Sequence, residues 1–398
     1  MRTFARVGDI AEQIRGVTYS KADASSAPTL GKVPVLRAGN IEAGELTFSD
    51  LVYVPADKVK TNQYVRENDV LIAASSGSRD VVGKSARSRR EFAGGFGAFL
   101  KVLRPSPHVD PSYFAHYFRT PSYRRRIATL ASGANINNIR NEHLSNLQIP
   151  LPPLDEQCRI ADILDRADAI RTKRREVLAH LDSLTQSIFH DMFGGSEPDS
   201  QRIVSLGEVV PQIDNGSSPK CETRAAALTE PGVLKLGAVT YGVFRSEENK
   251  AYLHGSLSPT HEVLPGDVLM TRKNTRDLVG AVALVDTVRS GLYLPDLIFR
   301  LHLDRSQVDP TYFHSLMMST AKRQEVRRLA SGSAASMPNI SKARLRNLPL
   351  ELPPLAMQQA FAARLQLVDA QRTAVERVLT ADDELFASLQ SRAFRGEL

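Results

Sequence analysis

The sequence predicts a mixed α/β (α+β) chain built by tandem duplication, in which a globular domain followed by a long α-helix occurs twice. Residues 130–157, LASGANINNIRNEHLSNLQIPLPPLDEQ, return at 329–358 as LASGSAASMPNISKARLRNLPLELPPLAMQ. In each copy this stretch follows short apolar runs bounded by Gly, Asn, Asp and Pro, a pattern typical of strands joined by loops. In each copy it leads into a long segment with helical apolar periodicity.

The length and composition of the chain agree with several domains of a soluble globular protein. The chain has 398 residues, 42% of them hydrophobic and 24% charged, which favours two or three domains. The duplication places the boundaries. We expect globular domains at residues 1–153 and 202–354, each followed by a spacer helix, at 154–195 and 355–398.

Short anchors outside the long repeat extend the duplication through both globular domains. DVL at 69–71 returns at 267–269, RDVVG at 79–83 returns as RDLVG at 276–280, and VDPSYF at 109–114 returns as VDPTYF at 308–313. Between the anchors the copies diverge, as in NIEAGELTFSD at 40–50 against AVTYGVFRSEEN at 238–249. A shared framework therefore carries two unlike surfaces.

The charge is concentrated in the globular domains. The chain has a net charge of +7 and a pI of about 9.4. Residues 1–153 hold 21 Lys and Arg against 13 Asp and Glu, and residues 202–354 hold 19 against 15, whereas both helical segments are slightly acidic. An excess of basic residues indicates a polyanionic partner for the globular domains, and the acidic helices indicate a different one.

Each globular domain is predicted to end in two short helices, and each spacer helix carries an apolar stripe. The Asp-Pro of the VDP anchor begins the first short helix, and Thr120-Pro121 breaks the run into two. In the long helices the apolar positions alternate at spacings of three and four, the pattern of a coiled coil. The predicted seam contains Ile163, Ile170, Val177 and Leu184 of the first helix and Val368, Val375, Leu379 and Leu389 of the second.

A single helix of this length cannot bury its stripe alone. We expect the two helices to pack on each other as an antiparallel coiled coil, because their lengths match and a duplicated unit can close with pseudo-twofold symmetry. At about 1.5 Å per residue each would span roughly 55 to 60 Å, holding the globular domains at opposite ends. The alternative is that each helix packs only on its own domain.

These features together resemble the specificity subunit of a type I restriction-modification system. The resemblance covers essentially the whole chain and is carried by the duplicated unit, the DVL strand with its polar loop and (R)D(V/L)VG, and the LPPLxxQ entry into each long helix. It implies two target-recognition domains, each similar to that of a TaqI-type adenine methyltransferase and each binding half of a split site in double-stranded DNA. One departure is Ala356-Met357, where the first helix has Asp155-Glu156, so equal partner contacts by the two helices are in doubt.

The resemblance also implies the partners and where the chemistry resides. Two adenine methyltransferase (modification) subunits would carry S-adenosylmethionine, and restriction subunits would use ATP. The chain itself has no Gly-x-Ser-x-Gly, HExxH or Asn-Pro-Pro-Tyr/Phe motif, and its nine histidines show no ligand spacing. Gly77 to Ser85 departs from a P-loop because five residues, where the motif has four, separate its glycines. We therefore expect a non-catalytic chain that holds no cofactor and no metal.

The polar loop after the DVL strand supplies the main DNA-contact candidates, because Arg and Lys bind phosphates or guanine, Asn pairs with adenine, and hydroxyls pair with either base. Arg79 and Arg276 could equally form structural pairs with the aspartates that follow them. The run Arg124 to Arg126 is interpreted as a solvated helix face. The predicted DNA-binding residues are Arg37, Ser75, Ser76, Ser78, Arg79 and Lys84 in the first copy and Lys220, Lys235, Thr271, Arg272, Lys273, Asn274 and Arg276 in the second.

Two other functions remain open from the sequence. One is a specificity subunit of a different methylation-based defence system, and the other is a stand-alone DNA-acting enzyme with an unrecognised site. The N-terminus has no signal-peptide core, no segment is apolar enough to span a membrane, and Cys158 and Cys221 stand alone. These observations predict a cytoplasmic protein without a membrane partner.

Overall fold

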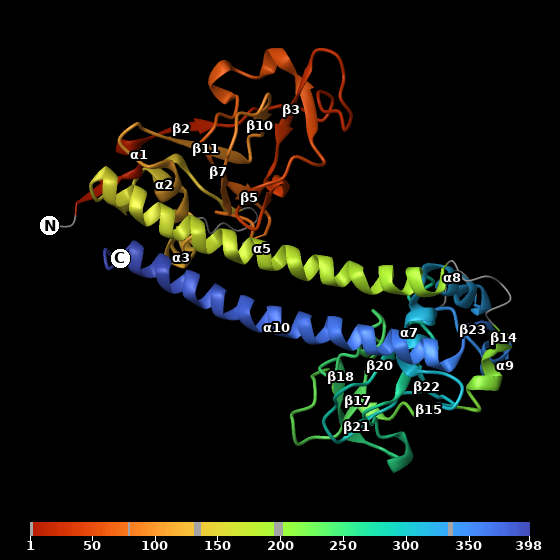
Figure 1. The fold of residues 1–398 in the computed structure, drawn as a ribbon. Helices are drawn as coiled ribbons and strands as arrows, with labels where there is room; N and C mark the ends of the chain where they lie inside the picture. Colours follow the sequence, from red (N-terminus) through yellow and green to blue (C-terminus); the bar gives the residue numbers. More distant parts are fainter. Residues whose placement is uncertain (1–2, 79, 131–136, 195–201, 333–336) are drawn as a thin grey trace. The chain divides into compact units, whose positions relative to one another are not determined.

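The computed structural model describes residues 3–78, 80–130, 137–194, 202–332 and 337–398. The chain divides into two units, of which unit 1 comprises Met1–Leu178 and Val375–Leu398 and unit 2 comprises Ala179–Ala374. Each unit combines antiparallel-dominated sheets and short helices with one end of each of two long helices, α5 (Leu154–Phe193) and α10 (Leu355–Ala393) (Figure 1). The predicted mixed α/β fold with two long helices is confirmed.

Unit 1 is organised around a four-stranded antiparallel sheet in the order β2-β11-β7-β9. The central strand β7 is the DVL strand of the sequence, and its residues Val70–Ala73 are all buried. A three-stranded sheet, β10-β3-β6, has a parallel β10–β3 pair and an antiparallel β3–β6 pair, and three two-stranded pairs complete the domain. The strands are β1 (Phe4–Arg6), β2 (Ala11–Arg15), β3 (Lys32–Leu36), β4 (Ile41–Glu42), β5 (Glu45–Leu46), β6 (Val52–Pro55), β7 (Val70–Ala73), β8 (Ser75–Ser76), β9 (Ser85–Arg87), β10 (Gly95–Phe96), β11 (Leu100–Pro105), β12 (Asn137–Asn138) and β13 (Gln148–Pro150).

Unit 2 repeats this plan with a four-stranded antiparallel sheet in the order β15-β22-β19-β20. Its second sheet has the order β16-β18-β17-β21. The β17–β21 pair in this sheet is parallel, like the β10–β3 pair of unit 1. The strands are β14 (Arg202–Ser205), β15 (Gln212–Asn215), β16 (Lys220–Cys221), β17 (Gly232–Leu234), β18 (Asn249–His254), β19 (Val268–Thr271), β20 (Val282–Leu284), β21 (Leu292–Tyr293), β22 (Ile298–His302) and β23 (Pro349–Leu352).

Short helices follow the same order in both units. Unit 1 has α1 (Val7–Ile10), α2 (Pro111–Tyr117), α3 (Pro121–Leu130) and α4 (Asn141–Ser145), and unit 2 has α6 (Leu206–Val209), α7 (Pro310–Met318), α8 (Thr320–Leu329) and α9 (Lys342–Arg346). The aspartate of each VDP anchor is the N-cap of its helix, and Pro occupies the first helical position, where no backbone N–H is needed.

The glutamine of the LPPLxxQ motif bonds to the VDP anchor of the same unit, which explains why the two motifs recur together. The Gln157 side chain accepts a hydrogen bond from the Asp110 backbone N–H at 3.0 Å and donates one to the Pro152 carbonyl at 2.8 Å. In unit 2, Gln358 makes the same bonds to the Asp309 N–H, at 2.9 Å, and to its own Pro-Pro segment. Both glutamines are buried, so the motif joins the entry of each long helix to the first short helix of its domain.

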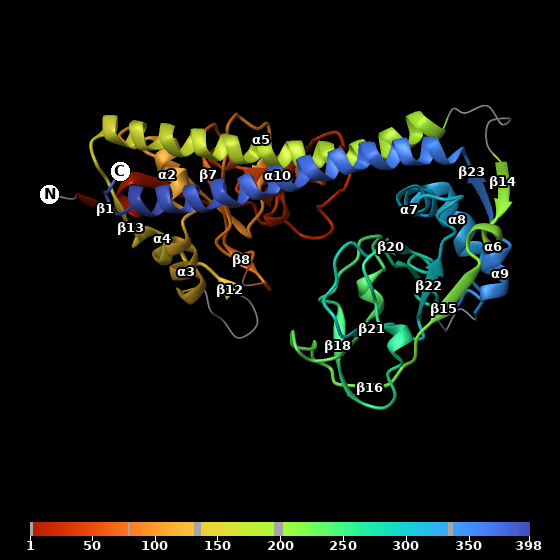
Figure 2. The same cartoon turned by 60° about the horizontal axis from the view of Figure 1, so that its bottom comes forward.

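The long helices pack in an antiparallel sense, as predicted. In unit 1 the start of α5 shares a core with the end of α10, where Leu164 packs in one cluster with Phe386. In unit 2 the end of α5 meets the start of α10, where the rings of Phe193 and Phe361 have centroids 5.5 Å apart. Figures 1 and 2 show α5 and α10 side by side in both views.

The predicted seam on α5 is wrong at Ile170, Val177 and Leu184, whose side chains are 49%, 44% and 41% exposed. The remaining predicted α5 residue, Ile163, is half-buried. Of the predicted α10 residues, Val368 is 7% exposed, and Val375, Leu379 and Leu389 are half-buried.

Ion pairs account for the difference on α5. In unit 1, Arg171 and Arg174 of α5 donate hydrogen bonds to Asp383 and Asp382 of α10. In unit 2 the roles of the helices are exchanged, because Arg372 of α10 contacts an α5 aspartate at 3.0 Å. The contact between α5 and α10 is therefore partly polar, and Ile170 and Val177 beside these pairs stay partly exposed.

Candidate nucleic-acid interface

Backbone hydrogen bonds to three other segments hold the loop after strand β7 in unit 1. The Ala74 N–H donates to the Phe99 carbonyl at 2.8 Å, and the Ala74 carbonyl accepts from the Ile139 N–H at 2.8 Å. The Gly83 N–H donates to the Ala73 carbonyl, also at 2.8 Å. Segments distant in the sequence thus fix the start of the loop from three directions.

Unit 2 repeats these bonds around the end of strand β19. The Arg272 N–H donates to the Leu297 carbonyl at 2.9 Å, the Ile340 N–H donates to the Arg272 carbonyl at 3.0 Å, and the Gly280 N–H donates to the Thr271 carbonyl at 2.9 Å. The matching bonds align Ala74, Ser75 and Ser76 of the first loop with Arg272, Lys273 and Asn274 of the second. The backbone frame is the same in both copies, and the side chains on it differ.

The RD(V/L)VG motif closes this frame. Gly83 and Gly280 have φ values of +80° and +76°, a left-handed conformation that favours glycine. Arg124 of α3 donates to the carbonyls of Val82 and Asp80, both at 2.7 Å. Arg323 of α8 donates in the same way to the two equivalent carbonyls of unit 2. Arg124 is therefore a structural residue of the loop rather than part of a solvated face.

The loop after β7 in unit 1 contacts the first part of the repeated stretch 130–157. The Ser75 hydroxyl donates to the Asn138 side-chain oxygen at 2.6 Å, and β8 pairs with β12. In unit 2 the Arg272 guanidinium donates to the Asn339 side-chain oxygen at 3.0 Å. The sequence analysis did not select these asparagines, although their place in both copies of the repeat was a signal for them.

A cleft with a volume of about 1020 Å³ lies beside this loop in unit 1. Its lining includes Arg37, Ser75 and Ser76, so the structure brings three of the predicted residues together. Arg37 is exposed, and its guanidinium donates to the Asp50 carbonyl at 2.9 Å. Arg15 and Phe99, which the sequence analysis did not select, also line the cleft.

A close approach of two chain segments shapes the wall of the cleft. A Cβ atom on Gly16 would lie 2.1 Å from the Gly97 carbonyl oxygen, which excludes any larger residue there. The Val17 N–H donates to the Phe96 carbonyl at 2.7 Å, and the Ala98 N–H donates to the Val17 carbonyl at 2.9 Å. The cleft therefore has a wall built from hydrogen-bonded backbone.

The predicted residues of the unit 2 loop divide into buried and accessible side chains. Thr271 is fully buried, and its hydroxyl donates to the Leu278 carbonyl at 3.1 Å. Asn274 is 7% exposed, and its amide donates to the Thr240 hydroxyl at 3.1 Å. Lys273 is half-buried and Arg276 is exposed. A DNA contact by Thr271 or Asn274 would require these internal hydrogen bonds to break.

The other predicted residues lie outside these two loop frames or outside the described chain. Lys84 and Ser78 are exposed in the turn that follows β8. Lys220 is exposed on β16, and Lys235 pairs with Glu248 at 3.1 Å. Arg79 lies outside the described residues.

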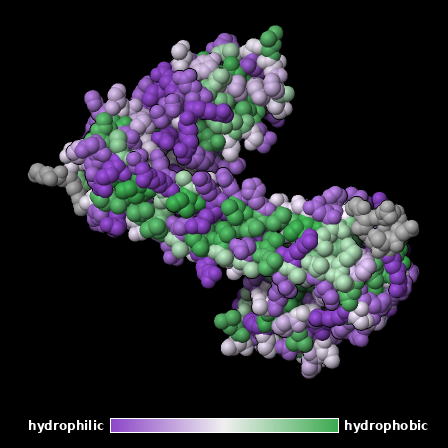
Figure 3. Space-filling view, viewed as in Figure 1, coloured by the Kyte–Doolittle hydropathy of each residue, from purple (hydrophilic) through white to green (hydrophobic). Residues whose placement is uncertain are grey.

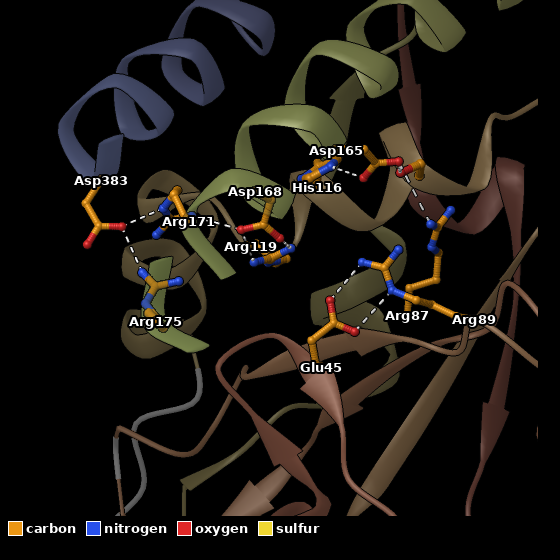
Figure 4. A network of polar contacts seen from close by, with 11 residues as sticks. Glu45, Arg87, Arg89, His116, Arg119, Asp165, Asp168, Arg171, Arg175 and Asp383 are labelled. Carbon is orange, nitrogen blue, oxygen red and sulfur yellow. Dashed lines mark hydrogen bonds and ion pairs between the residues drawn. The ribbon is translucent and has the colours of Figure 1, made fainter. Parts of the chain in front are cut away.

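A polar network joins the unit 1 domain to the long helices (Figure 4). His116 of α2 contacts Asp165 of α5 at 2.8 Å, and Arg119 donates to Asp168 at 2.7 Å. Burial raises the pKa of Asp165, but hydrogen bonds from His116 and Ser112 outweigh it and lower the pKa to about 2. The Asp165 carboxyl group is therefore ionised at neutral pH and holds α2 against α5.

Across the described part of the chain, no cluster of three or more His, Cys, Asp or Glu residues is placed to hold a metal ion. A search of the same residues for a helix long and apolar enough to cross a membrane found none.

Comparisons with known proteins agree with this arrangement. The family described as "Type I restriction modification DNA specificity domain" matches residues 3–180 and 265–381. The EcoKI specificity subunit of Escherichia coli K12 and the StySPI specificity subunit of Salmonella potsdam are each 30% identical to this chain, over 99% of it and 88% of their own length.

Solved structures share the fold. The type I restriction-modification S subunit from M. genitalium is 15% identical with a TM-score of 0.58, and the likeness covers 98% of this chain and 96% of that one. A chain from a structural study of complex assembly and conformational transition of the type I R-M system is 18% identical with the same TM-score, over 100% and 98% of the two chains. In type I systems the specificity subunits are non-catalytic. By its family match and its near full-length relatives, the chain belongs to the type I restriction-modification specificity subunits.

Proposed function

We propose that each unit reads one half of a bipartite site in double-stranded DNA, at the loop that follows β7 in unit 1 and β19 in unit 2. The observation that carries this proposal is the repeated backbone frame with different side chains on it. A protein that recognises two different DNA sequences needs one backbone geometry with which to approach DNA and two different sets of side chains with which to distinguish bases. Ser75 and Ser76 on one frame and Arg272 and Lys273 on the other meet that need.

We propose that the accessible side chains among the predicted residues contact DNA. In unit 1 these are Arg37, Ser75, Ser76, Ser78 and Lys84, and in unit 2 they are Lys220, Arg272, Lys273 and Arg276. Thr271 and Asn274 are assigned to the frame instead, because their polar groups are buried and hydrogen-bonded within unit 2.

We further propose that the long helices set the spacing of the half-sites and bind two modification subunits, which methylate adenine, and that restriction subunits supply ATP-dependent cleavage. Ile170 and Val177 of α5 are 49% and 44% exposed in unit 1, and Leu385 of α10 is 55% exposed there. Figure 3 shows hydrophobic residues exposed along the long helices. Apolar side chains repeated on one exposed helix are typical of a surface that another protein covers.

A domain exchange tests the proposal that each unit recognises one half-site independently of the other. Residues 1–150 are replaced by the equivalent part of a relative, and the hybrid is assembled with its modification subunits. Methylated-site mapping should show one new half-site and one retained half-site. A change in both halves would contradict the assignment of one half-site to each unit.

Two rival functions have direct tests. Purified chain is incubated with DNA, divalent metal and S-adenosylmethionine; cleavage or methylation without partners would make it a stand-alone enzyme and overturn the proposal. A neighbouring reading frame that encodes the adenine methyltransferase motif but belongs to another type of system would instead favour a different methylation-based defence system.

A further inference from the structure

We propose that Phe99 is a specificity-determining residue of unit 1, whose ring contacts the 5-methyl group of a thymine in the half-site that this unit reads. The inference rests on the proposed function of unit 1 and adds to it a residue and a base. Phe99 lines the 1020 Å³ cleft together with Ser75 and Ser76.

The position of Phe99 is fixed by its backbone. Its carbonyl accepts hydrogen bonds from the N–H groups of Ala74, at 2.8 Å, and Ser75, at 3.2 Å. The next residue, Leu100, begins β11 and is buried. The ring nevertheless remains 68% exposed. A large apolar side chain is thus presented to solvent from a segment whose backbone is hydrogen-bonded to the loop after β7.

The charges of the residues that line the cleft favour binding to the edges of DNA bases over binding to phosphates. Its charged lining residues are Arg15, Arg37, Glu42 and Asp50, whose formal charges cancel. A surface that binds the phosphate backbone carries an excess of cations, and proteins that wedge apolar residues into the minor groove use cations to bind there. Mixed donors and acceptors instead match the edges of bases in the major groove.

The chemistry of a phenyl ring then selects the base. In the major groove the 5-methyl group of thymine is the apolar feature of a base edge, and Phe is among the residues that contact it. Arg15, which also lines the cleft, supplies a cation that can add a polar contact to the same base pair or its neighbour. Unit 2 presents Leu297 at the equivalent backbone position, and that side chain is half-buried. The contact therefore belongs to the first half-site.

The test uses the full chain assembled with its modification subunits. The wild-type site is first found by methylated-site mapping, and affinities are measured for DNA with that site, with each thymine of the first half-site replaced in turn by deoxyuridine, and with an unrelated sequence. The variants are Phe99→Ala, Phe99→Leu and, as a matched control, Phe4→Ala, since Phe4 is an exposed phenylalanine of unit 1 on β1 that does not line the cleft.

We expect Phe99→Ala to weaken binding to the cognate site by roughly tenfold, the order of one lost base contact, and to leave binding to unrelated DNA unchanged. One deoxyuridine substitution should weaken the wild type by a similar factor and have no further effect on Phe99→Ala. Phe99→Leu should retain part of the affinity, and Phe4→Ala should behave as wild type. Only the first half-site should become degenerate.

The inference is overturned if Phe99→Ala, with an unchanged melting temperature, binds and methylates the cognate site as the wild type does. It is equally overturned if no deoxyuridine substitution reduces the Phe99→Ala effect. In both cases the wild type still recognises a bipartite site, so the proposed function stands. Absence of any site-specific binding by the wild-type complex would instead remove the proposed function itself.

Discussion

Single arginines determine whether the recognition loops keep their shape. Arg124 and Arg323 occupy equivalent positions in α3 and α8 and bind the carbonyls of the RD(V/L)VG turn in their units. A tight turn does not supply a backbone N–H donor for each of its carbonyl groups, so the guanidinium group donates hydrogen bonds to the remaining carbonyls. The neighbouring Arg125 is exposed, which makes the two adjacent residues a natural comparison.

We expect Arg124→Ala to lower the free energy of unfolding by about 1 to 3 kcal/mol, because it removes charged hydrogen bonds and leaves two carbonyls without a protein partner. Arg125→Ala should change it by less than about 0.5 kcal/mol. Urea denaturation of the two variants measures the difference. Equal losses in both would show that the turn does not depend on Arg124.

Lys273 tests the DNA assignment in unit 2. Its side chain is half-buried at the loop position equivalent to Ser75. If it neutralises a phosphate, Lys273→Ala should weaken binding to all sequences and reduce the salt slope by about 1; if it contacts a base, the loss should be about 1 to 3 kcal/mol for the cognate site alone.

Titration of the complex with DNA at several salt concentrations separates these two outcomes. Lys250→Ala is the control, since Lys250 is an exposed lysine of unit 2 on β18, away from the loop. If Lys273→Ala matches the wild type in both affinity and salt slope, Lys273 is not a DNA contact.

Helices α5 and α10 each pack into the cores of the units at their ends and form ion pairs with each other between these ends. Their inner faces bury apolar residues in the core of each unit, such as Leu164 in unit 1 and Phe361 in unit 2. Between these ends, Arg171 and Arg174 pair with aspartates of the other helix. Polar pairs fix the register of two helices more strictly than apolar contacts do. Ile170 and Val177 of α5 stay 49% and 44% exposed, and we propose that a partner covers them.

We expect Ile170→Asp and Val177→Asp to reduce association with the modification subunits at least tenfold, because each places a charge in a surface that the partner would desolvate. The melting temperature of the isolated chain should change little, since both side chains are already 44 to 49% exposed. Analytical size-exclusion or light scattering of the mixed subunits measures assembly. Leu30→Asp is the control, because Leu30 is fully exposed in unit 1 outside the helices. Normal assembly of both helix variants would place the partner elsewhere.

At the scale of the whole molecule, each unit contains one end of both helices, so neither domain is complete without distant parts of the chain. The rings of Phe394 and Tyr113 have centroids 5.0 Å apart, which brings the C-terminal segment into the core of the N-terminal unit. Each unit is therefore closed by one end of α5 and one end of α10.

Shortening both helices by one heptad should shorten the gap between half-sites. Removing Arg174 to His180 from α5 and Val375 to Ala381 from α10 keeps the apolar positions in phase and retains the helix ends that pack in each unit. At about 1.5 Å per residue the rod loses roughly 10 Å, close to three base pairs. We expect a gap shorter by about one to three base pairs with both half-site sequences retained.

Methylated-site mapping of the assembled variant measures the gap directly. Substituting Arg174→Ala and Arg175→Ala without a deletion is the control, because it removes the same ion pairs at full helix length. An unchanged gap in a folded, active deletion variant would show that the helices do not set the spacing.

The sequence alone determined the duplication, the mixed fold, the antiparallel helix pair and the family resemblance. Each depends on patterns that are local or periodic along the chain: DVL runs, Asp-Pro helix starts, LPPLxxQ entries and apolar residues three and four apart. It also led to Arg37, Ser75 and Ser76, three residues that the structure places around one cleft.

Only the tertiary structure decided which face of each element is used. Ile170 and Val177 fit an apolar period, yet their side chains stay 49% and 44% exposed, whereas Arg171 and Arg174 of the same helix form ion pairs with α10. Phe99 lies in a strand-like apolar run of the sequence, and the structure places it in the lining of the unit 1 cleft, where its carbonyl is bonded to the loop after β7. Spacing along a chain fixes periodicity, but burial and hydrogen-bond partners depend on segments brought together from far apart.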